Sequence, residues 1–264
     1  MGGTIIGSAR FKEFEEEETR KKAKKILDEF KIEALIAVGG NGTFTGLEKL
    51  SELGIKCIGI PGTIDNDVVS TDVTIGFDTA LNTIVQAVDR IRETSDSHAR
   101  ISIIETMGRH CGDLAIRAAV NCDLFATPDS PKIQEYELIN VIRDLHFKQN
   151  LRSIVVLITE NLYDVKKLAK NIEQELKIET RATVLGQIQR GGAPSAFDRY
   201  LGTMMGIFAV EQIEKKGNSS AIIGLSGNKL TVIPIQVALN IPKVDRFNAI
   251  YKILRLSGIF YKRK

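Results

Sequence analysis

Short apolar runs alternate along the chain with longer stretches in which apolar residues recur at helical spacing. The runs carry Val, Ile and Leu without regular polar positions, which is typical of strands buried on both faces of a sheet. They predict strands at residues 33–40, 56–62, 99–108, 152–160, 182–186 and 220–227. The helical pattern predicts helices at residues 13–30, 43–53, 78–96, 111–121, 135–147, 162–176 and 196–216.

This order of elements predicts an α/β fold with a parallel sheet in three layers. Such folds carry their chemistry in the loops that follow the carboxyl ends of the strands. Polar clusters follow five of the predicted strands, and these are "GGNGT", "PGTIDND", "MGRHCG", "TEN" and "GQIQRGG". The coincidence across five loops is stronger evidence for function than any one of these motifs alone.

Composition narrows the class of protein further. The chain has 264 residues, of which 43% are hydrophobic, enough for a substantial core. Its 36 basic and 33 acidic residues leave a net charge of +3, which argues against general affinity for nucleic acid. No apolar run approaches the ~20 residues of a membrane helix, and no signal peptide opens the chain.

Cysteine and histidine add no chemistry to the prediction. Cys57, Cys111 and Cys122 are too few and too widely spaced for a disulfide framework or a zinc site, which indicates a reducing cytoplasm. The three histidines show no metal-ligand spacing and are assigned no role; they are His98, His110 and His146.

The segment "GGNGT", residues 39–43, lies where a strand passes into a helix. Glycines let a backbone approach a ligand closely, and the first amides of a helix attract anions. A phosphate chain is therefore the expected guest. The alternative is a plain tight turn with Thr43 as the N-cap residue.

The segment "PGTIDND", residues 61–67, offers two carboxylates directly after a buried strand. Phosphoryl transfer to an alcohol needs a carboxylate that accepts the hydroxyl proton, and a second one can hold Mg²⁺ or orient the loop. In extended backbone Asp65 and Asp67 would point to similar sides. An Asx-turn network that merely closes the loop is the alternative.

Arginines flank two of the predicted strands. Arg100 and Arg109 lie at opposite ends of one strand, so both can serve one small ligand only if another subunit contributes. Arg181 and Arg190 surround a second, shorter strand and suggest a clamp for a sugar phosphate. Surface ion pairs are the alternative for each. Glu160 could accept hydrogen bonds from sugar hydroxyls, or could be a plain acid at a helix start.

Several motifs together resemble the bacterial ATP-dependent 6-phosphofructokinases over residues 2 to about 215. The matching stretches are "GGT-IIGSARF", "GGNGT", "PGTIDND", "TIGFDTAL", "MGRHCGDL", "ITE" and "ETRATVLGQIQRGG". The resemblance implies a glycolytic kinase that transfers the γ-phosphoryl group of MgATP to the C1 hydroxyl of fructose 6-phosphate, giving fructose 1,6-bisphosphate and ADP. It also implies two similar lobes with the active site in the cleft between them. We expect the ATP lobe at residues 1–76 with part of the C-terminal tail, and the sugar-phosphate lobe at 77–240.

The resemblance assigns roles residue by residue. Asp65 matches the general base, supported by Thr63, Asp67 and Arg109. The ATP and Mg²⁺ side matches Arg10, Phe11, Gly40, Asn41, Gly42 and Thr43, with Asn41 at the metal position. The sugar-phosphate side matches Thr63, Ile64, Asp65, Arg100, Met107, Gly108, Arg109, Glu160, Arg181, Gln187, Ile188, Gln189 and Arg190.

Further matches concern assembly and regulation. Arg92 and, more loosely, Asp123 match an allosteric nucleotide site. Arg100 matches an arginine that reaches into a neighbouring subunit, which implies a homotetramer in the cytoplasm. Gly42 and Gly62 stand where pyrophosphate-using relatives carry an acid and a lysine, so the resemblance implies ATP as the donor.

Three departures from the family pattern leave alternatives open. The family's opening strand and first glycine-rich loop do not precede "GGT", which predicts an N-terminally truncated member. Asn41 replaces a metal-binding aspartate, and Gln187 replaces a histidine. The first hypothesis is an active kinase. The alternative is a catalytically impaired sugar-phosphate or nucleotide-binding protein with a regulatory role. A third class, NAD-kinase-like or lipid-kinase-like proteins, is disfavoured by "PGTIDND" together with "QRGG".

Overall fold

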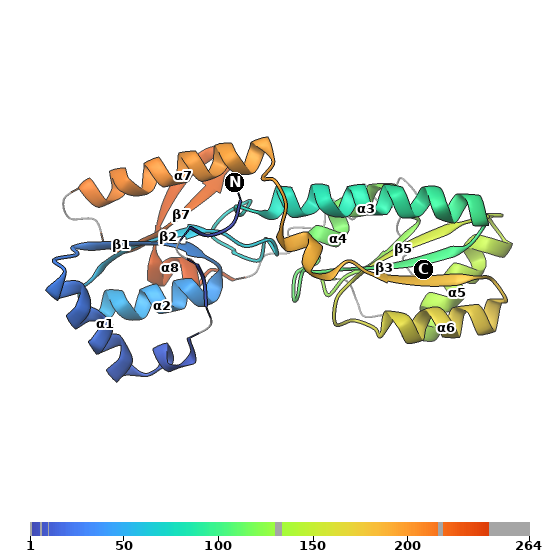
Figure 1. The fold of residues 1–264 in the computed structure, drawn as a ribbon, viewed down its shortest axis with the longest axis horizontal. Coiled ribbons are helices and arrows are strands. Elements are labelled where there is room, and N and C mark those ends of the chain that lie inside the picture. Colours follow the sequence, from blue (N-terminus) through green and yellow to red (C-terminus); the bar gives the residue numbers. More distant parts are fainter. Residues whose placement is uncertain (1, 6, 10, 130–133, 216–218, 243–264) are drawn as a thin grey trace. The chain divides into compact units, whose positions relative to one another are not determined.

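The computed structural model describes residues 2–5, 7–9, 11–129, 134–215 and 219–242 (Figure 1). The described chain divides into two compact units, each built around its own sheet. The first unit contains the chain up to Asp78 and again from Ala193, and the second contains Thr79–Gly192.

This division corrects the expected lobe boundaries. The predicted second lobe, 77–240, ends too late, because the chain from Ala193 onward belongs to the first unit. The reason is strand pairing: β7 (Ala221–Ser226) pairs with β2 (Lys56–Pro61) and so completes the first sheet. The tail expected with the first lobe lies outside the described residues beyond 242.

The first sheet has the order β1-β2-β7-β8, where β1 is Ala34–Gly39 and β8 is Lys229–Pro234. The first three strands run parallel, and β8 runs antiparallel to β7. Helices α2 (Asn41–Glu52) and α8 (Ile235–Leu239) cover one face, and α7 (Ala196–Glu214) covers the other (Figure 1).

Alternation along β2 explains these layers. Cys57 packs with the α2 side, whereas Ile58 and Ile60 pack with α7, so a continuous apolar run serves both faces. Outside α2 lie the short 3₁₀ helix η1 (Lys12–Glu15) and α1 (Glu17–Glu29). The single helix predicted over 13–30 is thus interrupted, because Glu16 takes an extended backbone conformation.

The second sheet has the order β4-β5-β3-β6, and all its pairings are parallel. Its strands are β3 (Ile101–Thr106), β4 (Leu124–Ala126), β5 (Ile154–Thr159) and β6 (Thr180–Val184). One face is covered by α5 (Glu135–Phe147) and α6 (Val165–Leu176). On the other lie α3 (Phe77–His98) and α4 (Asp113–Ala118), the latter followed by the 3₁₀ helix η2 (Ala119–Asn121) (Figure 1).

The predicted parallel three-layer α/β class is confirmed, with additions. The prediction missed β4, β8 and α8. For β8 the sequence held a usable indication in the Gly-Asn pair at 227–228. Both residues have positive φ in the structure, as a type I′ hairpin turn requires. Helix α6 begins at Val165 rather than 162 because the Asp164 carboxylate caps it, accepting from the amides of Lys166 and Lys167.

None of the helices within the described ranges has the length and apolar character needed to cross a bilayer.

Phe44 tests the core of the first unit. Its side chain is 0% exposed and packs between α2 and the sheet. Replacing it by alanine should lower the free energy of unfolding by about 3–5 kcal/mol, because a cavity remains where the ring was. Urea denaturation measures this change, and Phe30→Ala, at a side chain that is 74% exposed, is the control. A Phe44→Ala variant as stable as the control would contradict this packing.

Candidate active site

In the first unit, the predicted phosphate-binding loop and the acidic loop lie side by side. The amide of Gly62 donates to the carbonyl of Gly39 at 2.9 Å, joining the two loops at the ends of β1 and β2. A Cβ added at Gly40 would lie 3.7 Å from Cβ of Thr63. The structure therefore brings "GGNGT" and "PGTIDND" together, as parallel neighbouring strands require.

Helix α2 begins at Asn41 and not at residue 43, with Gly40 as the N-cap residue. The alternative in which Thr43 is the N-cap is therefore wrong. The amides of Asn41, Gly42 and Thr43 form the first turn, where a helix has unpaired N–H groups and a partial positive charge. This end of α2 is suited to bind phosphate.

The acidic loop turns at Ile64 and Asp65 instead of running extended. Thr63 Oγ1 accepts from the amide of Asp65 at 3.2 Å, and Thr74 Oγ1 donates to the carbonyl of Thr63 at 2.6 Å. Asp65 and Asp67 are both partly exposed, whereas the residue between them, Asn66, is buried. The loop therefore presents two carboxylates around a buried amide.

Asn41 contacts the second carboxylate of that loop. Its amide nitrogen donates to Asp67 Oδ2 at 3.0 Å and to the Asp67 carbonyl at 3.4 Å. Among the described residues no group of three or more His, Cys, Asp or Glu side chains could hold a metal ion. One carboxylate and one amide oxygen suit Mg²⁺ only where a ligand's phosphates add oxygens, which is how proteins commonly bind this ion.

Gly42 and Gly62, which the resemblance links to the choice of phosphate donor, have different surroundings. A Cβ at Gly42 would meet no atom within 4 Å, so the first turn of α2 is open there. A Cβ at Gly62 would lie 2.6 Å from Cγ1 of Val38. A side chain at position 62 would therefore have to displace the Val38 side chain.

In the second unit, the loop from Met107 to Gly112 follows β3 and is held by side chains from three other segments. The Met107 amide donates to Gln189 Oε1 at 3.0 Å, and the Arg109 amide donates to Glu160 Oε1 at 3.1 Å. The Gly112 amide donates to Asp129 Oδ2 at 2.5 Å.

The backbone of that loop explains its glycine. Gly108 has φ of +137°, and a Cβ there would lie 2.4 Å from the Cys111 carbonyl oxygen. Arg109 follows with φ of +55°, and its side chain is exposed at the carboxyl end of the strand. The loop thus exposes the Arg109 side chain while the Arg109 backbone amide is bonded to the Glu160 carboxylate.

The four residues at 187–190 divide into two kinds. They lie in the 3₁₀ helix η3 (Gly186–Arg190), where Gln187, Ile188 and Arg190 are exposed. Gln189 is 1% exposed, and its amide is bonded at both ends because Nε2 also donates to the Gly186 carbonyl at 3.0 Å. Gln189 therefore supports the site and does not present its side chain to a ligand.

Arg100 and Arg181 lie together at the opposite end of the sheet from Arg109. Glu179 pairs with both, at 3.8 Å from Arg100 Nη1 and 2.8 Å from Arg181 Nη2. A six-residue strand separates this end from Met107, a length of about 20 Å. The expected sharing of one sugar-phosphate site by Arg181 and Arg109 within a single chain is therefore wrong.

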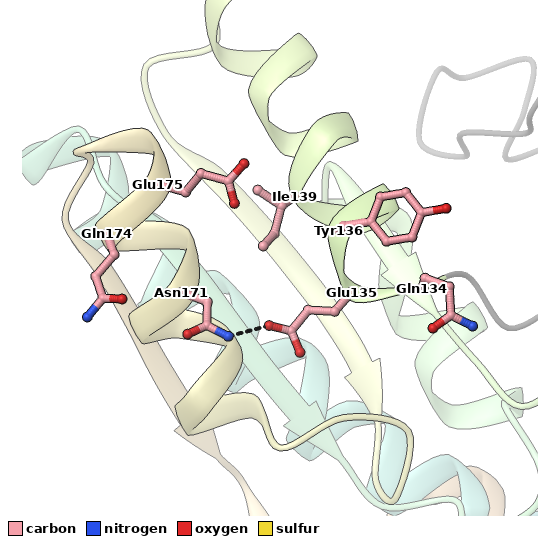
Figure 2. A pocket seen from close by; sticks show the side chains of 7 residues that line it. All are labelled: Gln134, Glu135, Tyr136, Ile139, Asn171, Gln174 and Glu175. Atoms are coloured by element: carbon pink, nitrogen blue, oxygen red, sulfur yellow. Dashed lines mark hydrogen bonds between the residues drawn. The ribbon is translucent and has the colours of Figure 1, made fainter.

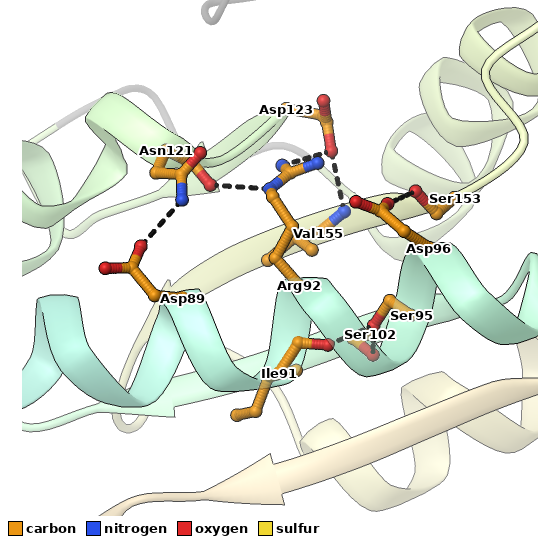
Figure 3. Close-up of polar contacts among 10 residues, drawn as sticks. All are labelled: Asp89, Ile91, Arg92, Ser95, Asp96, Ser102, Asn121, Asp123, Ser153 and Val155. Atoms are coloured by element: carbon orange, nitrogen blue, oxygen red, sulfur yellow. Dashed lines mark hydrogen bonds and ion pairs between the residues drawn. The ribbon is translucent and has the colours of Figure 1, made fainter.

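Arg92 and Asp123 form an ion pair (Figure 3). Arg92 Nη2 lies 2.7 Å from Asp123 Oδ2, and Arg92 Nε donates to the Asn121 carbonyl at 3.0 Å. The same carboxylate oxygen accepts from the Val155 amide at 2.8 Å. This network ties α3 to β5 and to the segment before β4.

Of the two residues expected on the ATP side near the N-terminus, the structure describes only Phe11. Arg10 lies outside the described residues. Phe11 is 58% exposed, and its ring centroid lies 6.2 Å from that of Phe14.

Sequence reasoning assigned no role to several residues that shape these loops. They are Asn66, Asp129 and Glu179, together with Asp198, whose carboxylate accepts from the Gly76 amide at 2.9 Å. Only Asn66 carried a usable indication, because it stands between two loop aspartates.

A separate groove of about 590 Å³ lies on α5 and α6 and contains none of the predicted site residues (Figure 2). Its walls include Glu135, Tyr136, Asn171 and Glu175, with Ile139 among its lining residues. The amide of Asn171 donates to Glu135 Oε1 at 2.5 Å.

The electrostatics of the second unit single out Glu105, on β3. Burial, together with the charges of Glu160 and Asp164, raises the pKa of its carboxyl group above the ordinary value. Burial also raises the pKa of two thiols, to about 11 for Cys57 in the first unit and to about 12 for Cys122 in the second, so both stay protonated at neutral pH.

Fold and site together define a three-layer α/β protein in which a helix start suited to bind phosphate lies beside an acidic loop. The family model described as Phosphofructokinase matches residues 1–213. The chain therefore belongs to the phosphofructokinase family. It is 51% identical over 233 residues to the ATP-dependent 6-phosphofructokinase of Teredinibacter turnerae, covering 87% of this chain and 71% of the relative. It is 46% identical over 266 residues to that of Spiroplasma citri, covering 100% and 80%.

Solved structures agree with this assignment. Phosphofructokinase from Saccharomyces cerevisiae superposes with a TM-score of 0.79 at 30% identity, covering 97% of this chain and 38% of the yeast chain. Pichia pastoris phosphofructokinase in the T-state gives 0.82 at 31%, covering 98% and 32%. A pyrophosphate-dependent phosphofructokinase from Marinobacter aquaeolei shares the fold at 20% identity, with a TM-score of 0.79 and coverage of 93% and 68%.

Glu105 gives a prediction about pH. A carboxyl group whose pKa is raised by folding stabilises the fold below its unfolded pKa, and this contribution is lost as the pH rises through the folded pKa. Glu105→Gln should therefore be more stable than the parent at pH 7–8. The gain should fade toward the ordinary glutamate pKa of about 4.3. Thermal unfolding across this range measures it, with the exposed Glu29→Gln as control; a gain that grows at low pH would contradict the cause given.

Proposed function

We propose that this chain transfers the γ-phosphoryl group of MgATP to the C1 hydroxyl of fructose 6-phosphate, as a cytoplasmic enzyme of glycolysis. The observation that carries the proposal is the pairing of an open helix start with a loop of two carboxylates in one unit. Membership of a family whose matching relatives are named ATP-dependent 6-phosphofructokinases supports it.

In this reaction Asp65 accepts the proton of the C1 hydroxyl as the C1 oxygen bonds to the γ-phosphorus and the bond from that phosphorus to the departing ADP oxygen breaks. Thr63 and Ile64 lie beside it on the same turn, next to the sugar and the transferred phosphate. The first amides of α2, at Asn41, Gly42 and Thr43, hold the phosphates of the nucleotide. Arg10 and Phe11 act on the ATP side.

Mg²⁺ would be held by Asp67 and Asn41 together with nucleotide oxygens. When bound, it would neutralise the negative charge that the phosphates carry. Asp67 has a second task in the protein itself, because it accepts the hydrogen bond that holds the Asn41 side chain.

The second unit would bind the sugar phosphate. Met107, Gly108, Arg109 and Glu160 form the part of this site at the carboxyl end of β3, and Gln187, Ile188 and Arg190 contribute from η3. Arg100 and Arg181 lie one strand length away, so they would complete the site of a neighbouring subunit. We propose a homotetramer on the same grounds, with the Arg92–Asp123 pair as part of an allosteric nucleotide site.

A second candidate function is regulatory binding without efficient catalysis. The observation that favours it is Asn41, which brings an amide and no charge to the metal position and is bonded to Asp67. Such a protein would bind sugar phosphate or nucleotide and transfer phosphate slowly.

A coupled assay for fructose 1,6-bisphosphate separates the two functions and tests Asp65. Asp65→Asn should reduce the turnover number by about 10²–10⁴-fold, because general base catalysis is typically worth that much. Asp28→Asn, on the surface of α1, should leave turnover unchanged. An active parent with an equally active Asp65→Asn variant would exclude Asp65 as the base.

Binding should be unequal between the two ligands. The sugar-phosphate residues retain their arginines and Glu160, whereas the metal position lacks its charge. Isothermal titration calorimetry should therefore give a lower Kd for fructose 6-phosphate than for MgATP. Tight MgATP binding with no sugar-phosphate binding would reverse this prediction.

A further inference from the structure

Asn66, between the two loop aspartates, is 3% exposed and has a φ of +51°. Asparagine tolerates this left-handed conformation better than most residues. Its Oδ1 accepts from the Thr74 amide at 2.9 Å and lies 3.2 Å from Thr74 Oγ1. Its Nδ2 donates to the Asp72 carbonyl at 3.3 Å. One side chain thus joins the acidic loop to residues 72–74.

Residues 71–74 are in turn fixed to the hairpin of β7 and β8. The Asp72 amide donates to the Leu225 carbonyl at 2.7 Å, and the Leu225 amide donates to Thr71 Oγ1 at 2.9 Å. The Gly227 amide donates to Asp72 Oδ2 at 2.8 Å. A rigid sheet therefore holds the segment that holds Asn66.

The backbone of β7 also contacts the backbone of the segment that follows the acidic loop. A Cβ added at Gly224 would lie 2.2 Å from the Ser70 carbonyl oxygen, so β7 and the segment after the acidic loop touch directly. Thr74 is 0% exposed, and its hydroxyl also donates to the Thr63 carbonyl. Both ends of the turn that carries Asp65 are consequently held by Thr74, one directly and one through Asn66.

We propose that Asn66 is a positioning residue for the two carboxylates of the loop. Its amide fixes the loop to residues 72–74, and its left-handed backbone lets the chain turn so that Asp65 and Asp67 remain partly exposed while Asn66 is buried. This inference rests on the proposed function, because it assigns Asn66 to the support of the proposed base. Asn66 touches no reacting atom and acts only through its neighbours.

Two substitutions distinguish the contribution of the Asn66 side-chain amide from that of its left-handed backbone conformation. Asn66→Gly permits the positive φ and removes the amide, whereas Asn66→Ala disturbs both. The matched control is Asn228→Gly, at an exposed asparagine with φ of +66° in the β7–β8 turn of the same unit. All variants are assayed at a temperature where circular dichroism shows them folded.

Asn66→Gly should lower kcat by about 10–100-fold while the KM for fructose 6-phosphate changes less than about 3-fold, because a misplaced base slows the chemical step and the sugar contacts lie mostly elsewhere. Asn66→Ala should lose at least as much, and Asn228→Gly should match the parent. If kcat of folded Asn66→Gly equals that of the parent, the amide contributes only to stability and the inference is overturned.

Amide hydrogen exchange tests whether Asn66 anchors the acidic loop, and this test does not depend on enzyme activity. The Thr74 N–H should exchange at least about tenfold faster in Asn66→Gly than in the parent, and at the parent rate in Asn228→Gly. Unchanged exchange at Thr74 would overturn the inference. A parent that makes no fructose 1,6-bisphosphate would defeat the proposed function instead, and the exchange rates would still show whether Asn66 holds the loop.

Discussion

A loop that leaves the end of a parallel strand carries backbone N–H groups that no neighbouring strand pairs, and burial of such groups without partners is costly. The two units meet this constraint in the same way, with side-chain oxygens that accept from loop amides. In the first unit Asn66 serves Thr74. In the second, Gln189 serves Met107 and Glu160 serves Arg109. The geometry of the candidate site residues in each unit depends on these bonds.

The consequence for function is that residues of one motif divide between ligand contact and support. In the acidic loop, Asp65 and Asp67 are partly exposed while Asn66 is buried between them. In η3, Arg190 is exposed while Gln189 is buried. Rigid support of this kind fixes charged groups in place before a ligand arrives, which is where much of the catalytic benefit of a phosphoryl-transfer site arises.

Much of this could be predicted from the sequence, and for a physical reason. Continuous apolar runs such as 154–159 favour buried strands. Neighbouring parallel strands place their following loops at one edge, which is why the loops of Gly40 and Thr63 lie together. The order of strands was beyond such reasoning, because the pairing of β7 with β2 is a long-range contact without a local pattern. The same limit hid the position of Arg181, whose place beside Arg100 depends on the pairing of β6 with β3.

The proposed reaction depends on Asp65 accepting the proton of the C1 hydroxyl of bound fructose 6-phosphate. A crystal structure of the chain with bound fructose 6-phosphate tests this most directly. We expect an Asp65 carboxylate oxygen about 2.6–3.2 Å from the C1 hydroxyl oxygen, within hydrogen-bonding reach of the proton to be removed. A sugar phosphate bound with its C1 hydroxyl turned away from Asp65, beside a different acid, would contradict it.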